Sequence, residues 1–255
     1  MIAMRTFKLF FILLCMVSIS HAELRTWTLT NGQTLKAELS RQDRPGGDNV
    51  KLVDADGENI SVPLDKLSPA DQEYVDIARV PAIDVDLLRE LRQVHFSSKV
   101  AAQTSDVREP EIRAQFGVRV KQTGFGTYKH ELKAEIFAIG RQIYADCYMV
   151  LARESVSFRL SKENDKRFEY MSDRWAPLRD LYLGVGQFAR RGEKYHGYLI
   201  LVTDELGRLV AHEESPDWLF DYRENMMKLK PGNYFDNHCI RRSPVRPDPI
   251  VDLSF

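Results

Sequence analysis

Cysteine, histidine and long apolar segments are scarce in this sequence of 255 residues. It contains 3 cysteines and 6 histidines. After residue 22 no apolar run approaches the ~20 residues that a membrane-spanning helix needs. Neither sign of charge dominates, since 36 lysines and arginines stand against 37 aspartates and glutamates. No basic tract with interleaved aromatic residues is present, so nucleic acid is not expected as a partner.

Sequence motifs that carry chemistry are also missing. The Gly-x-Gly pairs at 124–126 and 184–186 lack the third glycine and the βαβ unit of a dinucleotide site. There is no phosphate-loop lysine, nucleophile elbow or His-Glu-x-x-His segment. His238 and Cys239 are neighbours, but adjacent side chains rarely reach one metal ion. We therefore expect neither catalytic residues nor a cofactor or metal site.

Residues 1–22 have the pattern of a secretory signal peptide. Two basic residues precede an apolar run at 9–17, and residues 20–22 supply the small side chains of a cleavage site. A membrane anchor is the alternative, but this run is much shorter than the ~20 residues that span a bilayer. The pattern predicts cleavage before Glu23, export to the periplasm or the extracellular medium, and no transmembrane segment after cleavage.

Cleavage would leave two cysteines, Cys147 and Cys239, in a compartment where disulfides form. One bridge between them is possible, and closing a loop of about 90 residues contributes ~4 kcal/mol in the chain-entropy description. The alternative is that both are buried free thiols that pack as small hydrophobic residues. Cys147 lies in an apolar, strand-like run, and nothing in the sequence places Cys239 near it.

The strongest local signals lie between residues 25 and 76. Four short alternating runs at 25–30, 34–41, 49–53 and 59–64 are typical of strands. Asn31-Gly32 and Asp56-Gly57 separate runs at points where a two-residue hairpin turn needs positive φ. Ser68, Pro69 and Asp71 then have the order of an N-cap, a first helical residue and a capping-box partner. Residues 23–80 are therefore predicted to form a small β-barrel closed by a helical turn, which is typical of a binding module.

This segment resembles the SLA-one homology domain (SHD-one) family. The matching residues are Trp27, 31–32, 37–39, 50–52, 56–57, 60–64 and, most specifically, 66–75. The resemblance implies an SH3-like barrel that binds short peptides, as it binds Asn-Pro-Phe-type motifs in eukaryotic endocytic adaptors. Similar modules occur in exported bacterial proteins. The family has a basic residue just before the second turn, where this chain has Asp54, so the resemblance implies the fold and not the peptide specificity.

If the module binds a peptide, we expect the groove to run beside the strand at 50–54. Backbone pairing to an exposed strand edge would supply affinity, and side-chain pockets would supply specificity. Lys51, Val53 and Asp54 are the candidate contacts.

The rest of the chain predicts a second domain. Val85, Leu88, Leu91 and Val94 have helical spacing, so residues 81–110 are expected to form a short helix and a linker. Residues 111–240 then alternate with a period of two through seven or eight runs, which favours a β-sandwich. In general pattern this part resembles an immunoglobulin-like sandwich. One late helix is expected between Ser215 and Pro231, followed by a proline-rich tail at 241–255.

The sequence thus predicts a mainly β protein, with an N-terminal SH3-like barrel and a C-terminal sandwich. We favour an exported, non-enzymatic protein-binding or scaffolding protein whose partner is a peptide or another protein. One alternative is an envelope glycan-binding or hydrolytic protein with its site on sandwich loops at 175–179 and Asp217, where the aromatic ring of Trp175 could stack on a sugar. A purely structural envelope component is the other alternative.

Overall fold

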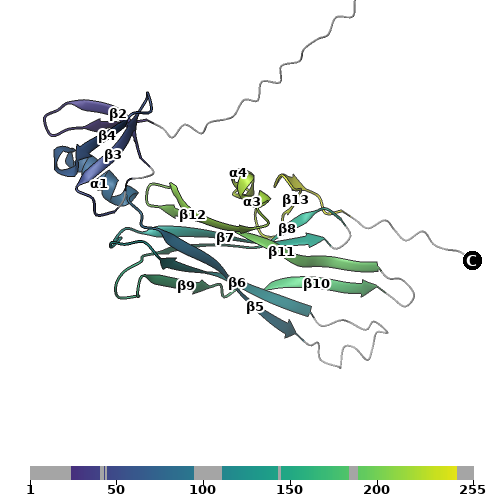
Figure 1. Cartoon of the computed structure of the whole chain (residues 1–255). Coiled ribbons are helices and arrows are strands. Elements are labelled where there is room, and N and C mark those ends of the chain that lie inside the picture. Colours follow the sequence, from purple (N-terminus) through teal and green to yellow (C-terminus); the bar gives the residue numbers. More distant parts are fainter. Residues whose placement is uncertain are drawn as a thin grey trace, which may run out of the picture. The chain divides into compact units, whose positions relative to one another are not determined.

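The computed structural model describes residues 24–40, 43, 45–94, 111–142, 145–183 and 189–245, and the chain is mainly β, as predicted (Figure 1). The expected signal peptide and the linker at 97–110 lie outside the described residues. The chain divides into two compact units. The small unit comprises residues up to 43 together with 48–72, and the large unit comprises 44–47 and the chain from Glu73 onward.

The small unit is a four-stranded antiparallel sheet in the order β1-β2-β3-β4. Its strands are β1 (Arg25–Thr28), β2 (Thr34–Leu39), β3 (Asn49–Asp54) and β4 (Asn59–Pro63). Gly32 and Gly57 have φ of 82° and 83°, so both predicted hairpin turns are confirmed. After the 3-10 helix η1 (Leu64–Lys66), Leu67 forms a bridge to Leu29, which returns the chain to the side of β1.

The core of the small unit is centred on Trp27. Trp27, Ala37, Leu52 and Leu67 are fully buried, and the indole N–H of Trp27 donates to the Ala37 carbonyl at 2.9 Å. A buried indole needs such an acceptor, because an unsatisfied N–H would oppose folding. The alternating pattern of the four runs therefore produces one apolar face around this ring.

Helix α1 (Pro69–Ala78) begins where the sequence predicted. The Ser68 hydroxyl donates to Asp71 Oδ2 at 2.8 Å, and the Asp71 N–H donates to Ser68 Oγ at 3.2 Å, so the predicted Ser68–Asp71 capping interaction is confirmed. The first residues of α1 belong to the small unit, whereas the residues from Glu73 onward belong to the large unit.

Residues 83–94 form strand β5 (Ile83–Val94), so the helix predicted for this segment is wrong. All twelve residues pair with β6 (Glu111–Gln122). Ile83, Val85 and Leu87 alternate with acidic residues, whereas Val85, Leu88, Leu91 and Val94 have helical spacing, so the segment was compatible with both periods. Pairing with β6 along its whole length makes this segment a strand and not a helix. This pairing cannot be predicted from the local sequence pattern.

The large unit continues as one antiparallel sheet in the order β14-β13-β8-β7-β11-β10-β6-β5, with β12 also paired to β11 and β9 also paired to β6. Its remaining long strands are β7 (Leu132–Gln142), β8 (Tyr148–Phe158), β9 (Arg167–Met171), β10 (Ala176–Leu183), β11 (Ala189–Asp204) and β12 (Leu209–Ser215). Strand β10 pairs with β6 through its first three residues and with β11 through its last five. The sheet thereby folds over into two layers (Figure 1).

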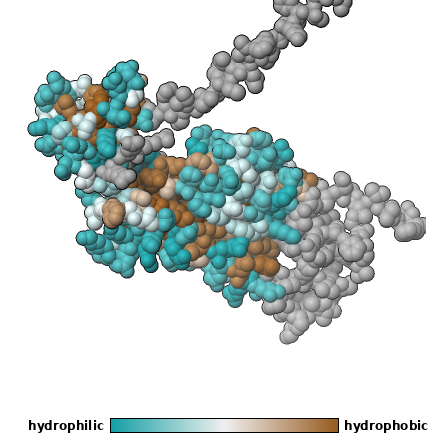
Figure 2. Space-filling model, viewed as in Figure 1, coloured by the Kyte–Doolittle hydropathy of each residue, from teal (hydrophilic) through white to brown (hydrophobic). Residues whose placement is uncertain are grey.

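An apolar core fills the space between these layers. It combines residues of β5, β6, β7 and β11: Val85, Val118, Val120, Leu132, Ala134, Ile136, Ile200 and Val202. Strands β5 and β12 are not paired with each other, and the half-buried Leu87 and Val210 of these two strands pack against the core. Apolar surface is visible along the gap between the layers in Figure 2. The immunoglobulin-like resemblance of this unit stays a prediction.

The outer face of β7 and β11 is covered by the segment after β12. Helices α3 (Trp218–Asp221) and α4 (Arg223–Met226) take the place of the single late helix that the sequence predicted. Tyr222 between them has φ of −107° and ψ of 22°, which interrupts the helix. Leu219, Met226 and Leu229 of this segment are buried in a second core.

This segment ends in two short strands, β13 (Tyr234–Phe235) and β14 (Arg241–Arg242). Strand β13 pairs with β8, and β14 pairs with β13, so the large sheet extends to the start of the predicted proline-rich tail. Residues 246–255 lie outside the described residues.

Candidate functional site

The three predicted peptide contacts lie on β3, which is an internal strand. Glu38 and Ala37 of β2 pair with Val53 and Asp54 on one side, and β4 pairs with residues 49–53 on the other. The Lys51 carbonyl also accepts a hydrogen bond from the Ser40 N–H at 2.8 Å. Neighbouring strands therefore already pair with both sides of β3, and β3 offers no free backbone edge to a peptide.

The carboxylate of Asp54 organises the second hairpin turn. Its Oδ1 atom accepts hydrogen bonds from the Asp56 N–H at 2.9 Å and the Glu58 N–H at 2.8 Å. Side chains of Asp commonly stabilise turns in this way. Lys51 is exposed and Val53 is half-buried, so these two remain accessible on the face of the sheet.

The open backbone edge of the small unit belongs to β4. Two hydrogen bonds show which residues of β4 direct their backbone groups toward β3. They run from the Leu64 N–H to the Asp48 carbonyl and from the Asp54 N–H to the Glu58 carbonyl. By the alternation of an antiparallel ladder, Asn59, Ser61 and Pro63 direct their backbone groups outward. No other strand among the described residues pairs with this edge.

The opposite edge of the sheet is occupied. The Thr28 carbonyl accepts from the Ser68 N–H at 2.7 Å, and the Thr30 N–H donates to the Lys66 carbonyl at 2.9 Å. The Thr28 N–H donates to Asp71 Oδ2 at 2.8 Å. The chain around the start of α1 thus satisfies the outer side of β1, and β4 is left as the continuous strand edge.

Both cysteines are buried free thiols in the structure, which is the second of the two alternatives left open by the sequence. Burial raises the pKa of Cys239 to about 12, and the nearby Asp236 carboxylate acts in the same direction. Burial also raises the pKa of Cys147. Neither thiol has the lowered pKa that marks a reactive cysteine.

Neither of the two cavities described below is lined by residues of the alternative site on sandwich loops. Trp175, immediately before β10, is half-buried, and Asp217 is exposed at the start of α3. No hydrogen bond or ion pair between them occurs among the described residues. The side chain of Arg179 lies outside the described residues. A hydrolytic site would need converging titratable groups, and these residues do not supply them.

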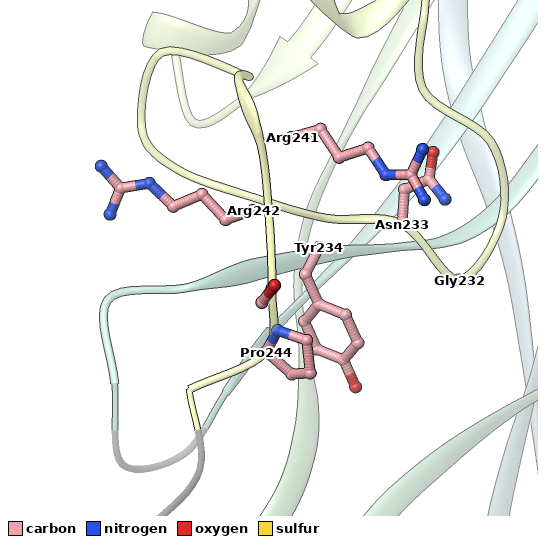
Figure 3. A pocket seen from close by; sticks show the side chains of 7 residues that line it. Gly232, Asn233, Tyr234, Arg241, Arg242 and Pro244 are labelled. Atoms are coloured by element: carbon pink, nitrogen blue, oxygen red, sulfur yellow. The ribbon is translucent and has the colours of Figure 1, made fainter.

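Two cavities lie instead at the end of the large unit, on the segment from Asn225 to Pro244. Their volumes are about 570 Å³ and 540 Å³. Both are lined by Asn233 and Arg241, and we call them together the C-terminal groove (Figure 3). This groove was not predicted from the sequence, because its residues were divided between the late helix and the tail. Four lysines and arginines against the single acidic residue Asp236 at 228–242 were the available signal.

Neither a metal site nor a membrane helix emerges from the described ranges. They contain no group of three or more His, Cys, Asp or Glu side chains placed to hold a metal ion. They also contain no helix that is long and apolar enough to span a bilayer.

Comparisons with protein-family models, curated proteins and solved structures gave no match. The candidate sites therefore rest on geometry. These are the outer edge of β4 in the small unit and the C-terminal groove in the large unit.

Proposed function

We propose that this chain is an exported, non-enzymatic binding or scaffolding protein that takes up a short extended peptide on its small unit. The observation that carries the proposal is the unpaired outer edge of β4. Asn59 and Ser61 each offer an outward N–H and C=O, and Pro63 offers a C=O. A peptide that pairs with this edge would extend the sheet by one strand, which is a common mode of peptide recognition.

Two of the predicted contacts can contribute specificity from the adjacent strand. Lys51 lies directly opposite Ser61, and Val53 lies opposite Asn59. Side chains that are directly opposite in a sheet share one face, and a peptide added beside β4 would continue the same rows. The exposed ammonium of Lys51 favours an acidic peptide side chain, and Val53 favours an apolar one two residues away.

The resemblance to the SHD-one family supports the same function. Four antiparallel strands, a turn of 3-10 helix and the bridge from Leu67 to Leu29 are compatible with the small closed barrel that the resemblance implies. Closure on the β1 side also explains why a ligand would use the other edge, since a paired edge cannot accept a further strand.

The test uses the chain from residue 23 onward, immobilised and exposed to a library of extended peptides. We expect enrichment of a short motif with alternating acidic and apolar positions. Ser61→Pro removes the outward N–H and should weaken binding of the selected peptide about tenfold or more. Ser61→Ala retains the backbone donor and is the matched control.

Thermal unfolding must show that both variants remain folded. If no peptide is enriched, or if Ser61→Pro binds the selected peptide as well as Ser61→Ala does, strand addition at β4 is wrong.

A further inference from the structure

Among the described residues, the C-terminal groove is lined by cations and by no carboxylates. Its two cavities bring together four basic residues: Lys228, Lys230, Arg241 and Arg242. The chain as a whole is nearly neutral, with a formal charge of −1. The basic lining is therefore a local feature of this surface rather than a consequence of overall composition.

Two of these cations are engaged within the protein. Arg242 Nε forms an ion pair with Asp236 Oδ2 at 3.0 Å, and Lys228 Nζ donates to Asn225 Oδ1 at 3.2 Å. Arg241 and Lys230 have no carboxylate partner among the described residues. Because successive strand residues point to opposite faces, Arg241 is directed away from Arg242, as Figure 3 shows.

The backbone that carries these side chains is held firmly. Arg153 Nη1 donates to the carbonyls of Met227 at 2.9 Å and Leu229 at 3.0 Å, and Leu229 is buried beneath the groove. On the other wall, Asp236 Oδ1 accepts hydrogen bonds from the His238 and Ile240 N–H groups, both at 2.9 Å. The groove is thus a preorganised surface, which lowers the entropic cost of binding.

Asn233 adds neutral donors at the point that both cavities share. Its Oδ1 atom accepts a hydrogen bond from the Lys230 N–H at 3.1 Å, which turns its Nδ2 amide group the other way. Figure 3 shows the Asn233 and Arg241 side chains directed to the same side. A guanidinium and an amide N–H₂ are both donors, and together they suit the oxygens of a tetrahedral oxyanion.

We propose that the C-terminal groove binds phosphate or sulfate groups of a polyanionic ligand. Arg241 and Asn233 contact one oxyanion at the centre, and Lys230 attracts the next group along the ligand. The site lies in the large unit and is independent of peptide binding at β4.

The test measures binding of sodium tripolyphosphate and of dextran sulfate to the chain from residue 23 onward by calorimetry. We expect binding that weakens as salt is raised, because partly exposed charges are screened. Arg241→Ala should weaken binding about tenfold, and Lys230→Ala several-fold, since each removes a charge-assisted contact. Preference for one probe distinguishes phosphate on a linear chain from sulfate on a sugar.

Lys194→Ala is the matched control, because Lys194 is an exposed lysine of the same unit on β11. This variant should bind both probes as the parent does, and thermal unfolding checks that all variants are folded. The proposal is overturned if neither probe binds. It is also overturned if Lys194→Ala weakens binding as much as Arg241→Ala, since only net charge would then matter.

Discussion

At the scale of single residues, Asp71 joins three parts of the small unit through one carboxylate. Oδ1 accepts from Arg25 Nη2 at 2.9 Å, and Oδ2 accepts from the Thr28 N–H and the Ser68 hydroxyl, both at 2.8 Å. Burial raises the pKa of Asp71, but the hydrogen bonds from Thr28, Arg25 and Ser68 more than offset it. The pKa therefore lies below the ordinary 3.8.

This environment predicts acid sensitivity of the small unit. Because the pKa of Asp71 is lower in the folded than in the unfolded state, its stabilisation is present above pH ~3.8 and is lost as pH falls through the folded value. Asp71→Asn should lower the free energy of unfolding by about 2 kcal/mol at pH 7 and much less at pH 3. Urea unfolding at both pH values measures this.

Asp65→Asn is the control for this experiment, because the Asp65 side chain is 76% exposed. It should leave stability almost unchanged at both pH values. Equal losses for Asp71→Asn at pH 3 and pH 7 would contradict the role given to its charge.

The roles of individual residues could be predicted from the sequence where their partners are close in the sequence. The Ser68–Asp71 cap and the glycines of the two hairpin turns follow from residues two to four positions apart. The hydrogen bonds from the Asp56 and Glu58 N–H groups to Asp54 are equally local, because both donors lie within the same turn. Arg241 was missed because its neighbours Asn233 and Lys230 come from another part of the late segment.

At the scale of elements, strand pairing determined secondary structure and open edges that the periodicity of the sequence left ambiguous. The apolar pattern of β5 fits a strand and a helix equally, and its pairing with β6 joins residues separated by the undescribed segment 95–110. The open edge of β4 could not be predicted either. Four runs and two hairpins indicate a meander, but they do not show that the chain after η1 returns to β1 and leaves β4 unpaired.

Besides its apolar core, the segment with α3 and α4 is held by one polar side chain of β8, Arg153. Arg153 bonds the carbonyls of Met227 and Leu229, and its Nη2 atom lies 3.4 Å from Oε2 of the buried Glu135. Arg153→Ala should lower the free energy of unfolding by about 2–3 kcal/mol, because a buried carboxylate loses one of its partners. Hydrogen exchange of residues 227–240 should accelerate and binding of tripolyphosphate should weaken.

Arg159→Ala is the matched control for this element, since Arg159 is an exposed arginine directly after the same strand. It should change neither exchange nor binding. If Arg153→Ala leaves exchange of residues 227–240 unchanged, this segment is held by its apolar core alone.

At the scale of the whole molecule, the division into two units predicts two unfolding transitions. The first turn of α1 belongs to the small unit and the rest of the helix to the large unit, which also includes residues 44–47. A unit of roughly fifty residues buries a smaller fraction of its surface than a larger one, so the small unit should unfold first. Multi-unit chains of this kind commonly depart from two-state behaviour.

The three tryptophans allow the transitions to be assigned. Trp27 is fully buried in the small unit, whereas Trp175 and Trp218 belong to the large unit. In urea, fluorescence of the parent should change in two steps, and Trp27→Phe should remove most of the first change. Asp71→Asn should move only the first midpoint and Arg153→Ala only the second, because each removes contacts within one unit. A single coincident transition, shifted by both substitutions alike, would mean that the chain unfolds as one cooperative body and that the two binding surfaces depend on each other's stability.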